Sequence, residues 1–452
     1  MTALLRKAVS LGPEYVIHGP PKVGQQYATN RSWILDQGAS GVGDEGWVRL
    51  WAPFYMLFPG ERGVFRTPQG LLDERVPPGA GLNSAGKAVL DRLDAEIAWA
   101  CRDCKNVAVT VYGYPSWSNG TPAIDADSDP HTDALFQPWD RTDRNAWNRW
   151  RDNTLGTFAP WGGGNRPDNW KKLYFKLPTD GFGMDSAWGC FFDWLYWRYS
   201  PDNPYRPVVP VGDPAVNQQA TITAIEYVNE PNLQLWPQMD PPPSTDPNGA
   251  AAWQTAATTI QCPVGQMLAT AVAVHAKLGR RLYLFGPATS DVDHSVSTRT
   301  FTKRDEFTNQ LLNMASSLGV VPDQKCNWTQ HNYSDIDHPQ ATTRASDTQV
   351  QIQGRWNGYQ EGGTASVLLT EGGALVDVVG GVAQQNTALV NAYERVRNTT
   401  AGLGKGVGMF TQYLYVSSPG FDSGLRNPSP PYAARPAFDG WKARIGETKR
   451  CP

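Results

Sequence analysis

Two glutamates each end a short apolar stretch that reads as a β-strand. Glu230 ends "TITAIEYVNE" and precedes Pro231, whereas Glu371 ends "SVLLTE" and precedes Gly372 and Gly373, which we expect to leave room for a ligand near the backbone. Hydrolysis of a glycosidic bond needs such a pair: one carboxyl group gives a proton, and the other attacks or activates water. Repulsion and burial separate the pKa values of two such groups.

Strands and helices are predicted to alternate along most of the chain, which favours a parallel sheet covered by helices. A plausible eighth strand is 13–21, and eight βα units would close into one (β/α)8 TIM barrel spanning 1–452. The other predicted strands are 45–53, 106–115, 220–231, 281–291, 326–335, 365–374 and 406–416. The predicted helices are 84–103, 189–200, 264–279, 304–319, 386–402 and 434–445.

The segment 116–188 interrupts this alternation and is rich in Trp, Asn, Asp and Gly. Because it follows the third predicted strand, we expect an inserted lid at the C-terminal face of the barrel, where active sites lie. Its "DADSD" is similar to the start of a calcium-binding loop. Pro130 and Phe136 stand where an EF-hand needs Gly and Glu, which argues against that assignment.

Composition narrows the range of partners. The chain has 452 residues, a net charge of −3 and a sequence pI of about 6.1, so it lacks a basic field for nucleic acid. No apolar run reaches the roughly 18–20 residues of a membrane helix. Its 18 Trp residues supply flat faces for sugar rings, although most are expected in the core. We therefore expect a carbohydrate partner, no nucleic acid and no membrane span, and the oligomeric state stays open.

The cysteines and the N-terminus bear on localisation. Cys101 and Cys104 form a CxxC at the end of a predicted helix, whereas a redox CxxC lies at a helix start, so a structural role is favoured. The N-terminal stretch does not resemble an export signal. The Trp content and the even number of cysteines favour a secreted or envelope protein, the lack of a signal favours the cytoplasm, and localisation stays open.

Other catalytic chemistries lack their motifs. His331, Asp335, Asp337 and His338 in "HNYSDIDH" could be considered as metal ligands, but no HExxH or facial-triad pattern accompanies them. The sequence has neither a Gly-x-Ser-x-Gly elbow nor a P-loop. We therefore expect no catalytic metal and no organic cofactor.

Seven ordered stretches resemble the strand-end motifs of clan A glycoside hydrolases, nearest in style to families 5 and 39. The resemblance covers most of the chain and implies a barrel with retaining β-glycosidase chemistry. The stretches are "GWVRLW", "TVYGYPSW", "WLYWRYS", "IEYVNEPNLQLW", "LYLFGPATSD", "QHNYSD" and "LLTEGG".

The resemblance implies a role for each matching residue. Glu230 would be the general acid/base, and Glu371 the nucleophile that forms a covalent glycosyl-enzyme. Asn229 would hydrogen-bond the sugar 2-hydroxyl. Arg49 would lie beneath Glu371 and keep it ionised, and Tyr333 would hydrogen-bond Glu371 and orient it.

Further residues are implied to line the cleft. His331 would lie near the acid/base or the sugar. Clan A enzymes often carry a Trp at the end of strand eight, but here the strand reads "FTQYLYVSS", so Gln412 or Tyr413 could take its place. The remaining candidate substrate contacts are aromatic: Trp51, Tyr114, Trp117 and Trp236.

The expected activity is hydrolysis of a β-glycosidic bond by double displacement with net retention. A transglycosidase would use the same residues with a longer-lived intermediate and an acceptor site. A carbohydrate-binding barrel without catalysis is the alternative from another class. The sequence identifies neither the sugar nor its linkage.

Overall fold

The computed structural model describes a large part of the chain. The described residues are 6–10, 46–57, 84–102, 105–114, 180–212, 215–232, 263–291, 303–339, 342–361, 363–403, 407–414, 417, 422–427 and 433–443.

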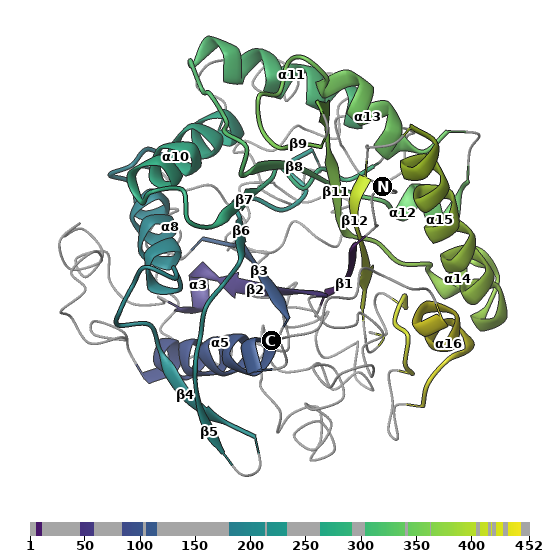
Figure 1. The fold of residues 1–452 in the computed structure, drawn as a ribbon, viewed down its shortest axis with the longest axis horizontal. Helices are drawn as coiled ribbons and strands as arrows, with labels where there is room; N and C mark the ends of the chain where they lie inside the picture. The colour runs from purple at the N-terminus through teal and green to yellow at the C-terminus, as the bar shows by residue number, and fades with distance from the viewer. Residues whose placement is uncertain are drawn as a thin grey trace, which may run out of the picture.

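Eight parallel strands form a closed barrel, so the predicted (β/α)8 fold is confirmed (Figure 1). Strand β1 pairs with both β2 and β12, which closes the sheet on itself. The strands, in spatial order, are β1 (Arg6–Ser10), β12 (Val407–Tyr413), β11 (Val367–Glu371), β8 (Cys326–His331), β7 (Tyr283–Phe285), β6 (Ala224–Glu226), β3 (Asn106–Tyr112) and β2 (Trp47–Pro53).

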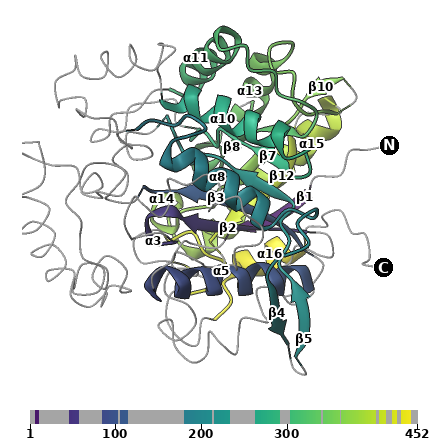
Figure 2. The same cartoon turned by 90° about the vertical axis from the view of Figure 1, so that its left-hand side faces the viewer.

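Helices surround the barrel, as the two perpendicular views show (Figures 1 and 2). Two small antiparallel ribbons lie outside the barrel sheet: β4 (Val208–Val211) with β5 (Val216–Gln219), and β9 (Gln360–Glu361) with β10 (Thr364–Ala365). In the described part of the chain, no helix combines the length and apolar character needed to cross a membrane. The helices are α3 (Phe54–Leu57), α5 (Ser84–Arg102), α8 (Ala187–Arg198), α10 (Pro263–Lys277), α11 (Arg304–Ser317), α12 (Tyr333–Asp337), α13 (Arg344–Ile352), α14 (Val376–Val379), α15 (Val382–Leu403) and α16 (Pro436–Ala443).

Several predicted boundaries differ from the structure. The eighth strand is Arg6–Ser10, whereas the predicted 13–21 lies outside the described residues. The strand predicted at 220–231 is regular only over Ala224–Glu226, and the one predicted at 326–335 ends at His331 before α12. The first of these predictions ran too long because the loop residues Tyr227 and Val228, which follow Glu226, are also buried and apolar. Of the predicted insertion 116–188, only 180–188 is described.

An apolar layer, which we call the apolar floor, crosses the interior of the barrel. Successive side chains of a strand point to opposite faces, so one set points inward. Seven strands each contribute one residue to a separate buried cluster: Ala8, Trp47, Ala108, Ala224, Phe285, Leu368 and Met409.

The next inward position on several strands is polar. Two residues beyond the apolar floor, six strands carry a buried polar residue: Ser10, Arg49, Thr110, Glu226, Thr370 and Thr411. The inward-facing side chains therefore change from apolar to polar between one layer and the next, toward the carboxyl ends of the strands.

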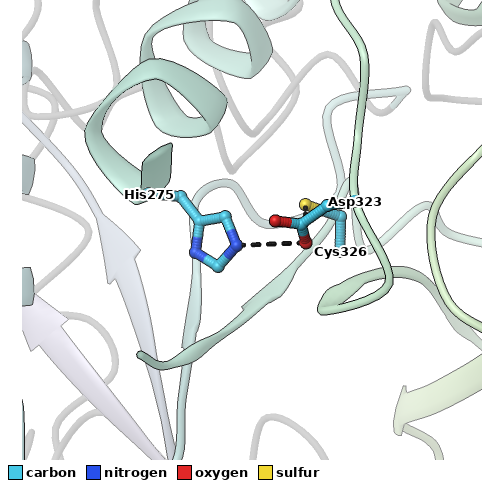
Figure 3. A group of neighbouring side chains, drawn as sticks. All are labelled: His275, Asp323 and Cys326. Atoms are coloured by element: carbon cyan, nitrogen blue, oxygen red, sulfur yellow. Dashed lines mark hydrogen bonds and ion pairs between the residues drawn. The ribbon is translucent and has the colours of Figure 1, made fainter. Parts of the chain in front are cut away.

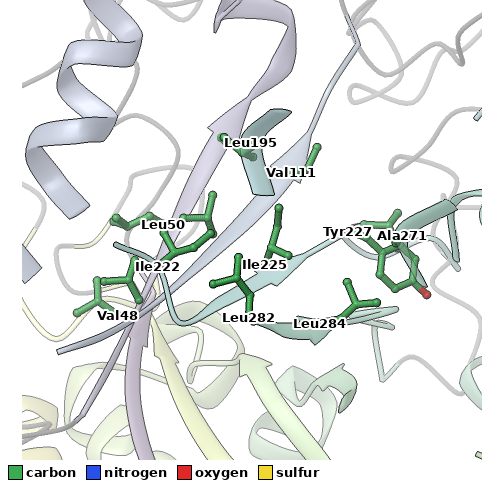
Figure 4. Packing of buried hydrophobic residues seen from close by; sticks show 14 of the residues in the cluster. Val48, Leu50, Val111, Leu195, Ile222, Ile225, Tyr227, Ala271, Leu282 and Leu284 are labelled. Carbon is green, nitrogen blue, oxygen red and sulfur yellow. The ribbon is translucent and has the colours of Figure 1, made fainter. Parts of the chain in front are cut away.

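The outer face of the sheet holds the main core. Figure 4 shows part of this cluster, in which Leu195 of α8 and Ala271 of α10 pack with strand residues such as Val48, Ile225 and Leu284. Several tryptophans in the described part of the chain are core residues: Trp188, Trp328 and Trp441 are at most 1% exposed.

A hydrogen-bonded chain ties α8 and α10 to the start of β8. His275 Nδ1 lies 3.0 Å from the Tyr196 hydroxyl, and His275 Nε2 lies 3.2 Å from Asp323 Oδ1 (Figure 3). The Tyr196 hydroxyl also accepts the Leu282 N–H. The imidazole therefore bridges two helices and the entry to a strand, at the amino-terminal end of the barrel.

Protonation of His275 is expected to destabilise this bridge. Burial lowers the pKa of His275 below its ordinary value, although Asp323 acts in the opposite direction. The unfolded chain then binds the proton more readily. The contribution to stability is therefore complete above about pH 6.5 and lost as the pH falls through the lower folded pKa. We predict that His275→Gln reduces the loss of unfolding free energy between about pH 7 and pH 5, measured by urea denaturation.

The matched control is His338→Gln, because His338 is exposed. This variant should keep the pH dependence of the parent protein. An unchanged pH dependence in His275→Gln would show that protonation of this imidazole has no part in stability.

Candidate active site

Arg49 is the centre of the polar layer above the apolar floor. Its Nε and one terminal nitrogen donate to Glu226 Oε2 at 2.9 and 2.6 Å, and the other terminal nitrogen donates to Glu371 Oε2 at 2.6 Å. Asn229 Oδ1 accepts a further bond at 2.9 Å. The Trp51 ring lies 4.4 Å from the guanidinium carbon. The guanidinium thus links strands β2 and β11 to β6 and the loop that follows it.

Glu371 reaches the interior because β11 is irregular at its end. Leu369 pairs with Gln330, and the next paired residue, Glu371, pairs with His331, so Thr370 is an extra residue. A bulge of this kind reverses the face to which the following side chain points. Glu371 therefore faces the interior, as His331 does, although strict alternation would place it on the outer face with Leu369.

Both oxygens of the Glu371 carboxylate have donors. Arg49 donates to Oε2, and the Tyr333 hydroxyl donates to Oε1 at 2.7 Å. The Tyr413 ring meets Tyr333 edge-on, with centroids 6.4 Å apart. The contacts expected between Arg49, Tyr333 and Glu371 are thus present, and the carboxylate is fixed in orientation.

His331 lies between the two strand-end carboxylates. Its Nδ1 is 2.9 Å from Glu230 Oε1, and its Nε2 is 3.7 Å from Glu371 Oε2. The imidazole is fully buried. Glu230 and Glu371 therefore flank one ring, and the first of these contacts is a hydrogen bond that needs a proton on one partner.

The backbone at Glu230 lies in the left-handed region, with φ at 41°. A side chain other than glycine costs roughly 1–3 kcal/mol in such a conformation. Its N–H donates to the Ala288 carbonyl at 3.0 Å, which helps to hold the unusual geometry. The residue with this unfavourable backbone conformation is therefore the one whose carboxyl group hydrogen-bonds His331.

The charges of the cluster shift the pKa values of its members. Burial works against ionisation of Glu226, but Arg49 and then His331 more than offset it, so the pKa of Glu226 is lowered. Burial also works against a charged His331, yet Glu371 and Glu230 raise its pKa above the ordinary value. Burial, with the Glu371 charge, raises the pKa of Tyr333 far above its usual range, so its hydroxyl remains a donor.

Three side chains that were predicted to contact the substrate make contacts within the protein instead. Trp51 is 2% exposed and lies against Arg49. The Tyr114 ring is buried against Phe182. Gln412 is fully buried, and its Nε2 lies within hydrogen-bond distance of three backbone carbonyls at the end of β12 and beyond it. These contacts favour supporting roles for all three side chains.

Other predicted contacts differ in how far the structure describes them. Asn229 is buried beside Arg49, and Tyr413 is half-buried next to Tyr333. Trp117 and Trp236 lie outside the described residues.

The two glycines after Glu371 leave no open space for a ligand, contrary to the expectation from the sequence. A Cβ atom on Gly372 would overlap the Asn332 side chain, and one on Gly373 would overlap the Tyr413 carbonyl oxygen. They permit close packing of this turn against the protein itself.

Sequence reasoning missed the residues beneath the catalytic candidates. Glu226 is fully buried and accepts bonds from the hydroxyls of Thr110 at 2.7 Å and Thr329 at 3.1 Å, besides those from Arg49. A signal was available, because a glutamate within the apolar "TAIEYV" two residues after Ala224 must share the inward face.

One group of side chains could be considered for a metal. Among the described residues, His275, Asp323 and Cys326 have ligand atoms within 4.8 Å of one another. Arg280 Nε lies 2.8 Å from one oxygen of Asp323, and the Lys325 N–H donates to the other. Burial raises the pKa of the Cys326 thiol to about 12. These donors already hold the carboxylate, so we interpret the group as part of the bridge at the start of β8.

No protein-family model matches the sequence, and no curated protein is similar to it. Solved structures with a similar fold include a family 39 glycoside hydrolase from the gut symbiont Bacteroides cellulosilyticus WH2, at 9% identity and a TM-score of 0.48. The alignment covers 97% of this chain and 63% of that one.

Two further structures are similar. A monomeric beta-xylosidase from Caulobacter crescentus CB15 has 11% identity and a TM-score of 0.47, with 98% of this chain and 68% of that chain covered. A GH5_18 protein from Bifidobacterium longum subsp. infantis has 13% identity and a TM-score of 0.49, with 98% and 78% covered. These similarities concern the fold alone. At these identities the function has to be argued from the site.

Removal of Glu226 is expected to destabilise the fold strongly. Glu226→Ala takes away the acceptor of two Arg49 bonds and leaves a buried positive charge partly uncompensated. Breaking one partner of a buried ion pair costs about 3–5 kcal/mol. We predict a fall of this size in the unfolding free energy, measured by urea denaturation, and a smaller fall for Glu226→Gln, which keeps an acceptor oxygen.

Glu394→Ala is the control, because its ion pair with Arg397 is partly exposed, with 34% of the Glu394 side chain and 53% of the Arg397 side chain accessible. Such pairs contribute about 0.5 kcal/mol or less. If Glu226→Ala proved as mild as this control, Arg49 would be sufficiently compensated by Glu371 alone.

Proposed function

We propose that this protein is a retaining glycoside hydrolase that cleaves β-glycosidic bonds. The observation that carries the proposal is the placement of two carboxyl groups at the mouth of the barrel, on either side of His331, with one of them held at both oxygens. This asymmetry between the two carboxyl groups matches the two roles that the chemistry requires.

Glu371 is the proposed nucleophile. Arg49 and Tyr333 each donate to a different oxygen, which fixes the plane of the carboxylate before a substrate arrives. Attack on the anomeric carbon would form a covalent glycosyl-enzyme. Tyr333 would keep its bond to the oxygen that does not attack, or exchange it as the ester forms.

Glu230 is the proposed acid/base. Its side chain is 13% exposed, against 8% for Glu371, and its hydrogen bond to His331 engages Oε1, so the proposed contact with a leaving group would be made through Oε2. In the first step Glu230 would protonate the departing oxygen. In the second step it would take a proton from the water that attacks the anomeric carbon and releases the sugar.

Asn229 and His331 complete the proposed site. Asn229 accepts from Arg49 through Oδ1, so its amide nitrogen can donate to a sugar hydroxyl. His331 holds Glu230 through a ring nitrogen. Both reaction steps use side chains of the protein, acting on a carbohydrate substrate.

Variants of the two glutamates test the proposal. Glu371→Ala and Glu230→Ala should each reduce turnover of aryl β-glycosides by orders of magnitude. Azide should restore activity to Glu371→Ala and yield an α-glycosyl azide, because the small anion enters the space of the lost carboxylate on the same face. Product configuration is read by NMR across a panel of aryl β-glycosides.

The same experiment separates the alternatives. A β-glycosyl product from the parent protein at the first time point indicates retention, and an α product would indicate inversion. An active Glu371→Ala protein without azide would exclude Glu371 as nucleophile. Product analysis with an added acceptor sugar distinguishes a transglycosidase, and binding without turnover would identify a carbohydrate-binding barrel.

A further inference from the structure

The first turn of α12 is held by a residue from a distant part of the chain. Asn332 stands at the N-cap position, where asparagine is favoured, but its side chain makes no capping bond. Instead, the carboxylate of Asp291 accepts the N–H groups of Ser334 at 3.1 Å and Asp335 at 3.0 Å, one on each oxygen. These are the second and third residues of α12, whose free N–H groups a local cap would serve.

Asp291 is itself anchored next to the proposed acid/base. The preceding residue, Ser290, exchanges two hydrogen bonds with the Asn232 amide: its N–H donates to Oδ1 at 2.8 Å, and its carbonyl accepts from Nδ2 at 2.9 Å. Asn232 lies two residues after Glu230, and it is fully buried. The N–H of Glu230 donates to the Ala288 carbonyl in the same segment.

We propose that Asn232 and Asp291 form a brace that sets the position of Tyr333, and through it Glu371, relative to Glu230. Both would be positioning residues, because neither contacts the reacting atoms. The catalytic role of the brace rests on the proposed function, whereas its effect on the position of Tyr333 does not depend on that function.

The chemistry of Asp291 supports this role. The carboxyl group is fully buried, and burial together with repulsion from Asp335 raises its pKa to about 7, while Arg344 acts in the opposite direction. An ionised group in such a place costs stability. An asparagine would avoid that cost, but only a carboxylate offers two oxygens that accept two N–H groups at once.

The remaining sides of α12 are held by other elements. The Asp335 carboxylate accepts the Arg344 N–H and pairs with the Arg344 guanidinium at 3.0 Å, which joins α12 to α13. Arg395 of α15 donates to the Asp335 carbonyl at 2.6 Å. Asp291 connects the β6 and β7 side of the barrel to this short helix.

The position of Tyr333 matters because the separation of the two carboxyl groups decides the reaction. Retaining enzymes keep them about 5–5.5 Å apart, and inverting enzymes about 6.5–9.5 Å. A displacement of about 1 Å in a catalytic group can cost roughly 10²-fold in rate. A brace that spans both sides of the cleft would keep this separation constant.

A double-mutant cycle tests the brace. We expect Asp291→Ala to lower kcat/KM by about 10–100-fold, mainly through kcat. Tyr333→Phe should have a similar effect. The double variant should be no worse than the poorer single variant by more than about 3-fold, because both changes remove the same constraint. Losses that multiply in the double variant would overturn the proposal.

Asp323→Ala is the matched control. The Asp323 carboxylate also accepts a backbone N–H and lies near a basic side chain, but it precedes β8, whereas Tyr333 follows it. The length of that strand, roughly 17 Å, separates the two sites. This control should lower the melting temperature and leave kcat/KM unchanged.

A structural measurement decides the question without any turnover. In a crystal structure of Asp291→Ala, the distance from the Tyr333 hydroxyl to Glu371 Oε1 should increase from 2.7 Å to beyond the hydrogen-bond limit of about 3.5 Å. An unchanged distance would overturn the brace. If Asp291→Ala does not fold, Asp291→Asn and Asn232→Ala take its place in both experiments. A parent protein that hydrolyses no glycoside would refute the proposed function, and this measurement would still decide the brace.

Discussion

The buried guanidinium of Arg49 is the interaction on which the interior of this barrel depends. A positive charge removed from water is stable only when carboxylates lie against it with good geometry. Its carboxylate partners, Glu226 and Glu371, come from two other strands, and Asn229 follows one of them. The charge is therefore fully compensated only in the barrel in which β2, β6 and β11 are all in place.

Arg49 divides its hydrogen bonds unequally between its two carboxylate partners. Glu226 receives two bonds from Arg49 on a single oxygen, and the hydroxyls of Thr110 and Thr329 add two more. Glu371 receives one bond from Arg49 and one from the Tyr333 hydroxyl. Glu226 thus takes most of the compensation. Glu371 at the mouth has one donor on each oxygen, which fixes the direction of the carboxylate in the way its proposed role requires.

The sequence predicts the barrel because its strands and helices alternate regularly, and the strand-end motifs identify the residues around the mouth. The orientation of Glu371 is less accessible, because it depends on the extra residue Thr370, which no local pattern announces. The left-handed backbone of Glu230 is imposed by its surroundings rather than by residue type. The contact of Asp291 with α12 joins segments 43 residues apart, so it needs the fold to be known first. The expectation of open space beside Gly372 was wrong for a similar reason, because the Asn332 side chain fills that space.

The apolar floor beneath the polar layer has a consequence for the charge of Glu226. The side chains of the floor, among them Trp47 and Phe285, are hydrophobic and lie on the amino-terminal side of Glu226. The carboxylate is instead compensated by Arg49 and by the hydroxyls of Thr110 and Thr329. The charge balance of the deepest carboxylate is therefore confined to a single layer of the barrel.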